Sequence, residues 1–280
     1  MNANSKVVVL DMGIFTHRTW FASQAQVGKF MSLKYTCMMM ILSCLKIIGI
    51  EQEDIIICAC EGGKNWRKQH STEYKSDRKP IPQYFWDEMN DLLDDIDIST
   101  NWNIIKIQTI EADDIMATAC KYFKDREVIL VTYDHDLFQM WHYDNVKIFS
   151  PHPKSKGYKI KPQNYNAYAQ IAKQIEKEKG DGLISTINNE YDRKTREMLV
   201  NLLSLPSFVE QPILDAFEKI NYNKSLNIDL LPGRRLKEIF LEIYSKNKVV
   251  TYEQQENKIN RKIERKKKKM LKTKGVKNEA

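Results

Sequence analysis

The sequence lacks the features of a disulfide-stabilised, zinc-binding or membrane-spanning protein. Among its 280 residues are five cysteines, and no two of them are spaced as C-x-x-C or as a zinc motif, so we expect reduced thiols in a cytosol. The longest apolar stretch, 37–50, is broken by Ser43 and Lys46 and is too short to cross a bilayer. We expect no signal peptide, because the chain moves straight into the first predicted strand. We therefore expect a cytoplasmic protein with no membrane partner.

Positive charge is concentrated near one end of the chain. Residues 258–274 hold ten lysines or arginines and one glutamate, a net +9, so that the chain's total of +7 leaves −2 for the remainder. A near-neutral body with carboxylate clusters, followed by a basic segment, suits an anionic polymer that is bound partly through metal ions. Basic tails also serve as solubilising ends, so the charge pattern alone leaves both interpretations open.

The most informative stretch is EADDIMATACKYFKDREVILVTYDHD, residues 111–136. Apolar residues at helical spacing, followed by the apolar run 128–131, predict a helix and then a strand covered on both faces, as parallel strands usually are. Acids stand at the start of this helix and just beyond this strand, where open α/β sheets place their sites. They are Glu111, Asp113, Asp114, Asp134 and Asp136. If the chain stays extended there, Asp134 and Asp136 project to one side.

Acids also follow two other predicted strands. The strand that begins at Lys6 ends on Asp11, and the strand over 54–61 ends on Glu61. Acids at a helix N-terminus or in a turn have ordinary explanations, but three acid-bearing strand ends are hard to credit to turn preference alone. Carboxylates crowded at one edge repel each other unless cations compensate, and oxygen ligands suit magnesium or manganese.

The remaining pattern completes an α/β core with a helical C-terminal region. We expect helices over 31–49, 83–95 and 135–141, strands over 103–109 and 146–149, and a helical pattern over 197–244. The basic segment 251–271 is expected to become helical only on contact with nucleic acid.

A polar, basic and aromatic segment, KNWRKQHSTEYKSDRKP at 64–80, follows the second strand. Lysine and arginine neutralise phosphates, and tryptophan and tyrosine stack on bases, so this segment is a candidate lid that grips nucleic acid. A solvated connecting loop has the same composition, which does not separate the two interpretations.

The succession VVVLDMG, WRK…EYKSDR, EADD and VTYDHD resembles the 5′-nuclease family, the flap endonucleases and 5′-3′ exonucleases of the PIN-like fold. The later run YDNVKIFSPHPKSKGYKIK is similar to the T-even-type bacteriophage ribonucleases H. The likeness covers 6 to about 182 and, more weakly, 199–244. It implies a PIN-like parallel-sheet domain over 1–160 with a basic arch at 64–90. A helical region over 161–250, with a reduced helix-three-turn-helix, and a basic tail over 251–280 would follow.

The resemblance implies roles for individual residues. Those that match the first metal site are Asp11, Glu61, Glu111, Asp113 or Asp114, and Asp134, while Asp136 matches the second site. Those that match positions gripping the scissile phosphate and the 5′ end are Arg18, Lys75 and Arg78. The other residues expected to contact nucleic acid are Trp66, Arg67, Lys68, Tyr74 and Lys79.

Three departures from the family pattern bear on these roles. Tyr133 stands where the family has a small residue, and Glu61 where many members have aspartate. The family's G-D-x-x-D segment, which supplies second-site ligands and binds duplex DNA, is matched only by Glu178 and Asp181, without a glycine-rich hairpin after them. A simple helix cap and turn at Gly180–Gly182 is the alternative explanation.

The activity that the resemblance implies is that of a 5′-3′ exonuclease or flap endonuclease with ribonuclease H activity. It would use two magnesium ions, with manganese able to substitute, on DNA with a 5′ flap or on RNA–DNA hybrids. The implied protein is a phage-encoded monomer that removes primers or flaps in the bacterial host cytoplasm, with single-strand DNA-binding protein or other replisome proteins as candidate partners. The alternatives are a PIN-type endoribonuclease, which would not need the arch, and a catalytically weak DNA-binding accessory protein.

Overall fold

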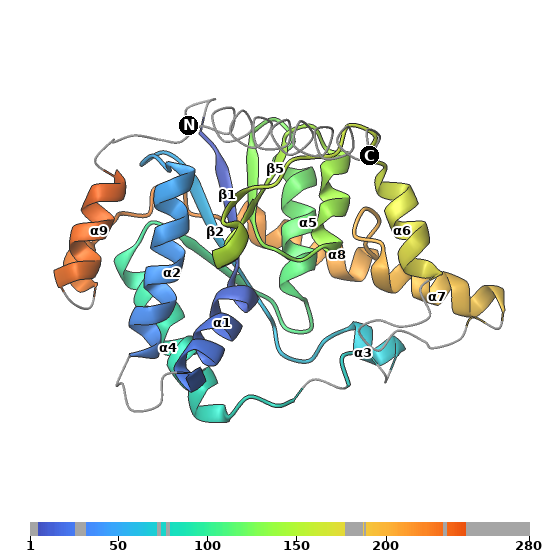
Figure 1. Cartoon of the computed structure of the whole chain (residues 1–280), viewed down its shortest axis with the longest axis horizontal. Coiled ribbons are helices and arrows are strands. Elements are labelled where there is room, and N and C mark those ends of the chain that lie inside the picture. The colour runs from blue at the N-terminus through green and yellow to red at the C-terminus, as the bar shows by residue number, and fades with distance from the viewer. Residues whose placement is uncertain are drawn as a thin grey trace, which may run out of the picture.

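The computed structural model describes residues 5–25, 32–71, 74–76, 79–176, 187, 189–231 and 234–244. In this part of the chain one six-stranded sheet has the order β3-β2-β1-β4-β5-β6 (Figure 1). The strands are β1 Val7–Asp11, β2 Ile55–Cys60, β3 Asn103–Lys106, β4 Val128–Val131, β5 Val146–Ser150 and β6 Gly157–Tyr158. All neighbours pair in parallel except β5 and β6. The prediction of an α/β protein with a parallel-sheet core flanked by helices is confirmed.

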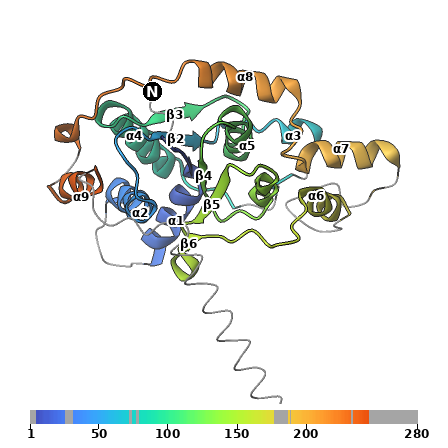
Figure 2. The same ribbon diagram turned by 90° about the horizontal axis from the view of Figure 1, so that it is seen from above.

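Helices cover both faces of the sheet, as Figure 2 shows for α2, α4 and α9 on one side and α5 on the other. The α-helices are α1 Met12–Ala25, α2 Leu33–Ile48, α3 Arg67–His70, α4 Gln83–Ser99, α5 Ala112–Tyr122, α6 Ala167–Ile175, α7 Glu190–Val200, α8 Ser207–Glu218 and α9 Arg234–Tyr244. Shorter 3-10 helices are η1 Asp136–His142, η2 Pro153–Ser155 and η3 Ile228–Leu230. The basic segment 251–271, expected to become helical, lies outside the described residues.

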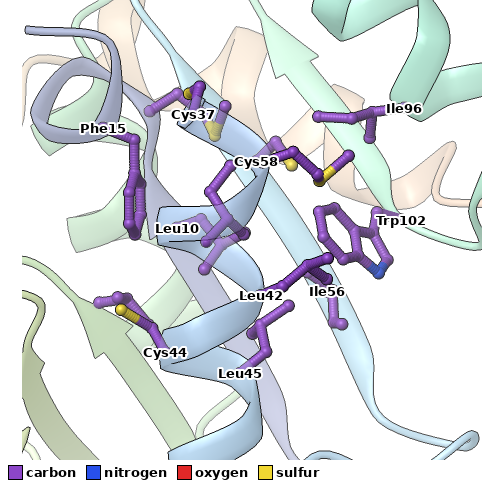
Figure 3. Close-up of a cluster of buried hydrophobic side chains, with 14 of the residues drawn as sticks. Leu10, Phe15, Cys37, Leu42, Cys44, Leu45, Ile56, Cys58, Ile96 and Trp102 are labelled. Atoms are coloured by element: carbon purple, nitrogen blue, oxygen red, sulfur yellow. The ribbon is translucent and has the colours of Figure 1, made fainter. Parts of the chain in front are cut away.

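The apolar runs of the strands follow from this two-sided cover. Successive side chains of a strand point to opposite faces. Accordingly, Val8 and Leu10 pack in a core with α2 and α4, where Figure 3 shows Leu10. Val7 and Val9 pack in a second core with α5 and α8. Because both faces are buried, every position of β1 is apolar until Asp11, which ends the strand.

Local signals at its two ends delimit α2, expected over 31–49. The side chain of Ser32 accepts a hydrogen bond from the Tyr35 N–H, which satisfies a backbone donor at the first turn. Gly49, with φ of 71°, adopts the left-handed conformation that suits a residue without a side chain and donates its N–H to the Leu45 carbonyl. The helix therefore begins at Leu33 and ends at Ile48.

The direction of the strand order reverses at β1. From β1 the chain goes to β2 and β3 on one side and then returns to β4 on the other side. Ligands of open α/β sheets bind at such a switch point, beyond the carboxyl ends of the strands. The acids that follow β1, β2 and β4 therefore belong to one edge of the sheet.

No described helix is both long enough and apolar enough to span a membrane.

The cysteines give a test of this core. All five are free and buried, and burial raises the pKa of Cys37 and of Cys60 to about 12. Because the thiolate is the reactive form, we expect a disulfide reagent near pH 8 to label the native protein only slowly and all five thiols once guanidinium unfolds it. Rapid labelling of the native protein, followed by peptide mass spectrometry, would contradict the placement of the cysteine that reacts.

Candidate active site

A cavity of about 690 Å³ lies at the carboxyl edge of the sheet. Asp11, Glu61 and Asp134 line it from the ends of β1, β2 and β4, and Asp113 lines it from the first turn of α5. The structure thus brings together four of the acids predicted to bind metal. A larger cavity, of about 1060 Å³, lies near the start of β2 and β3 and is lined mainly by amide and hydroxyl side chains. It offers no comparable group of acids, so we place the site at the smaller one.

Asp11 occupies the centre of this edge and is almost fully buried. Its two carboxylate oxygens accept hydrogen bonds from the Ile14 backbone N–H at 3.2 Å and from the Thr132 hydroxyl at 3.0 Å. Burial nevertheless raises the pKa of Asp11 to about 6, and the charge of Asp134 adds to this rise. The position of Asp11 is therefore fixed by hydrogen bonds, while its charge remains poorly compensated.

The other acids show the same imbalance. Burial, and then the charges of Asp134 and Asp11, raise the pKa of Asp113 well above its usual range. Glu61 is exposed to the cavity, yet burial of its carboxyl against the cavity wall, and then the charge of Glu111, raise its pKa to about 7. Acids in this state are stabilised by any cation that enters among them.

Lys75 is a cation placed at this cavity, and its backbone has φ of 52°. Its Nζ lies 2.5 Å from Oε1 of Glu111. Its charge lowers the pKa of Asp11, of Glu61 and of Asp113, against the larger effect of burial. One ammonium does not balance four cavity carboxylates and Glu111.

The carboxylates that line the cavity are of the chemical type that binds a divalent metal ion. Asp11, Glu61, Asp113 and Asp134 offer hard oxygen ligands with an excess of negative charge, which is the chemistry that magnesium and manganese require. As placed, no three histidine, cysteine or acidic side chains of the described residues lie close enough to hold one ion between them. Binding an ion would therefore draw these carboxylates inward.

Two of the acids predicted to bind metal pair with a buried arginine and do not line the cavity. Glu111 and Asp114 form a capping box at the start of α5, and both are paired with the buried guanidinium of Arg67. Asp114 also accepts a hydrogen bond from the Trp66 indole at 2.9 Å, and Glu111 accepts one from the Tyr74 hydroxyl at 3.1 Å. Of the two candidates Asp113 and Asp114, the structure therefore places Asp113 in the cavity.

The arch residues fall into two groups. Lys68 and Lys79 are exposed, and Lys79 lines the cavity. Trp66 and Arg67 are 1% and 3% exposed, and Tyr74 is 8% exposed. The expectation that these three contact nucleic acid is corrected by their burial, since their polar groups bind acids of α5 instead.

Of Arg18 and Tyr133, only Tyr133 lines the cavity, although the resemblance implies a phosphate contact for Arg18. Arg18 donates from Nη1 to the Pro151 carbonyl at 2.7 Å and does not line the cavity. Tyr133, the departure from the family pattern, does line it, with its ring edge-on to His152 at 5.7 Å.

Asp136 does not share the cavity with Asp134, because the chain turns into η1 instead of staying extended. The backbone N–H of Asp136 donates to Oδ1 of Asp134, while the Asp136 carboxylate accepts from Nε2 of Gln174 on α6 at 2.5 Å. Gln174 in turn contacts the buried amide of Gln139. The other residues expected to serve the site, Arg78, Glu178 and Asp181, lie outside the described residues.

Sequence reasoning missed a group of mostly apolar residues that also line the cavity. They are Ile14, His17, Trp20, Phe21, Pro80 and Ile81, and Phe21 is 67% exposed. The spacing of Ile14, His17 and Phe21 places them on one face of α1, the helix that begins directly after Asp11. That spacing was the available signal.

Comparison with known proteins gives the following matches. A family model described as 5′-3′ exonuclease, N-terminal resolvase-like domain, matches residues 6–189. A 5′-3′ exonuclease of Mycoplasmopsis pulmonis (strain UAB CTIP) is 30% identical over 138 residues, which are 49% of this chain and 46% of that protein. A 5′-3′ exonuclease of Buchnera aphidicola subsp. Schizaphis graminum (strain Sg) is 27% identical over 155 residues, 51% of each chain. The chain thus spans about half the length of these curated relatives.

Among solved structures, the T5 D15 protein co-crystallised with metal ions matches with a TM-score of 0.47 and 15% identity, over 85% of this chain and 99% of that one. A likeness of this degree says nothing about the chemistry of the site.

The crowding of acids predicts a pH-dependent effect of Asp113→Asn. The raised pKa of Asp113 means that its ionised form destabilises the fold. This cost is absent below the ordinary carboxyl pKa of about 4 and grows as the pH rises toward the raised value. Without metal, the variant should therefore have a higher melting temperature than wild type near pH 8, by about 2–4 °C for each kcal/mol gained in the free energy of unfolding. Near pH 4 the two melting temperatures should be equal.

Asp125→Asn, at an exposed position of the loop after α5, is the matched control and should not change the melting temperature at either pH. Equal melting temperatures of Asp113→Asn and wild type near pH 8 would show that neither burial nor the neighbouring carboxylates destabilise the ionised form of Asp113.

Proposed function

This chain belongs to the 5′-3′ exonuclease family that carries the N-terminal resolvase-like domain, and from that premise we propose that it is a metal-dependent 5′ nuclease. The observation that carries the proposal is the meeting of Asp11, Glu61, Asp113 and Asp134 at one cavity beside Lys75. Hydrolysis of a phosphodiester needs compensation of negative charge and an activated water, and this site concentrates the ligands for ions that supply both.

The proposed ligands are these four carboxylates, with magnesium as the ion and manganese able to substitute. A bound divalent ion would polarise the scissile phosphate and lower the pKa of a water. Glu111 and Asp114 are not included, because Arg67 pairs with both. A second ion at Asp136, with Glu178 and Asp181, stays a prediction from the sequence.

The chain's own residues supply binding and orientation. We propose that Lys75 and Lys79, which line the cavity, hold phosphate oxygens and offset the charge that develops during cleavage. Trp20 and Phe21 offer apolar surface on which a base can stack and which keeps bulk water from the reacting group. Arg18 and Arg78 stay predicted phosphate contacts.

The proposed substrates are DNA with a 5′ flap and RNA–DNA hybrids. The curated relatives, named 5′-3′ exonucleases, support action from a 5′ end. Ribonuclease H activity, phage origin and a role in replication rest on the sequence resemblance alone. The basic cavity rim at Lys79 and the exposed Lys68 suit a polyanion of either kind.

The test combines two substrates with one variant. Purified protein with magnesium should cleave a 5′-labelled flap DNA or RNA–DNA hybrid, and chelation by EDTA should stop it. Asp134→Asn should lower the cleavage rate by about 100-fold or more and leave DNA binding equal or tighter, because one repelling charge is removed.

Asp125→Asn, which makes the same change of charge at an exposed position, should cleave like wild type. Full activity of Asp134→Asn, or equal cleavage with and without EDTA, would refute the proposed metal site. Cleavage of unpaired RNA in preference to both substrates would favour an endoribonuclease instead.

A further inference from the structure

Arg67 is buried, does not line the cavity, and donates four hydrogen bonds to two acids and a carbonyl. Its Nε donates to the Leu199 carbonyl at 2.8 Å, and its Nη2 donates to Oδ1 of Asp114 at 2.6 Å. Its Nη1 donates to Oε2 of Glu111 and, at 3.1 Å, to Oδ2 of Asp114. The guanidinium also lies 4.5 Å from the ring of Trp66. Each of these groups is buried, so water cannot replace the contacts.

The contacts of Arg67 continue to Lys75 through a single residue. Glu111 accepts from Arg67 on Oε2 and from Lys75 on Oε1, and the Tyr74 hydroxyl bonds the same carboxylate. Two cations therefore balance the two carboxylates Glu111 and Asp114. If Arg67 lost its charge, Glu111 and Asp114 would repel each other, and Lys75 would face both of them. The place of Lys75 at the cavity thus depends on a residue that never reaches the cavity.

The same guanidinium also fixes the end of α7. The last carbonyls of a helix have no partner within it, and a cation near them is favourable. Arg67 takes the carbonyl of Leu199, and the amide of Gln139 takes the carbonyl of Val200. Gln139 also accepts from the Leu202 N–H. The end of α7 is therefore held by residues that follow β2 and β4, the strands whose ends carry Glu61 and Asp134.

We propose that Arg67 is a positioning residue that couples the docking of α7 to the place of Lys75 in the active site. The inference rests on the proposed function, since the role assigned to Lys75 is to hold phosphate. A lysine cannot replace Arg67, because one ammonium cannot present the planar fork that reaches Asp114, Glu111 and Leu199 together. The chemistry of Lys75 is thereby tied to the helical region that follows residue 160.

A double-mutant cycle tests the coupling. Arg67→Met should lower kcat on flap DNA by about 10- to 100-fold and change KM by less than about threefold, and Arg67→Lys should recover little of this loss. In a Lys75→Met background, Arg67→Met should lower the single-turnover rate by less than about threefold, because the group it positions is already absent. Lys124→Met removes the same charge from an exposed position of the loop after α5, to which no role in binding or cleavage is assigned, and should keep kcat within about twofold of wild type.

An equal loss from Arg67→Met in both backgrounds would overturn the inference, since a merely structural role lowers the rate whether or not Lys75 is present. So would a kcat of Arg67→Met equal to that of Lys124→Met. If Arg67→Met gives no cooperative thermal transition, Arg67→Lys takes its place in the cycle. If the rate of Lys75→Met falls below detection, the cycle is decided by DNA affinity instead.

The cycle is also run on the affinity for 5′-flap DNA in EDTA, where the effect of Arg67→Met should again shrink once Lys75 is replaced. A wild-type chain that binds this DNA but cleaves nothing would refute the proposed function and not the positioning role. The binding cycle alone would then decide that role, and equal losses of affinity in both backgrounds would overturn it.

Discussion

The crowding of carboxylates at one edge of the sheet is the constraint on which the surrounding structure depends. Asp11, Glu61, Asp113 and Asp134 reach this edge because parallel strands end together and β1 lies at the switch point. Burial, and then the charges of neighbouring carboxylates, raise the pKa of Asp11, Glu61 and Asp113. The fold offsets only part of this cost with hydrogen bonds to Asp11 and with Lys75. The negative charge that remains uncompensated gives the site its capacity to bind a cation.

Two neighbouring acids show how the fold separates structural charge from functional charge. Glu111 and Asp114 are as deeply buried as Asp11, but a guanidinium compensates them. A buried ion pair is tolerated only when its hydrogen bonds are satisfied. Arg67 accordingly donates from Nε, Nη1 and Nη2. Residues within four positions of each other thus serve opposite purposes, and Asp113 alone among them is directed to the cavity.

The sequence allowed the fold, and the meeting of three acids at one edge of the sheet, to be predicted for physical reasons. Strands buried on both faces read as apolar runs, and the acid after each run marks where the strand ends, so Asp11, Glu61 and Asp134 could be grouped before any coordinates existed. Side-chain direction within EADD could not be read, because it depends on Arg67, 44 residues before Glu111. Composition could not tell that Trp66 and Arg67 are buried while Lys68 is exposed. The spacing of Asp134 and Asp136 predicted two side chains on one side of an extended chain, but the chain turns into a 3-10 helix at Asp136.

The anchoring of α7 has a consequence for where this protein can be divided. A cut near residue 160, the boundary that the sequence suggests, would remove the Leu199 carbonyl to which the Arg67 Nε donates. It would also strip Leu199, Val209, Ile213 and Phe217 from the core that covers α5. A fragment ending there would expose the apolar side of the helix that carries Asp113, and would be prone to aggregate. Helices α7 and α8 therefore complete the core on this side of the sheet, and a shortened version of the chain must keep both of them.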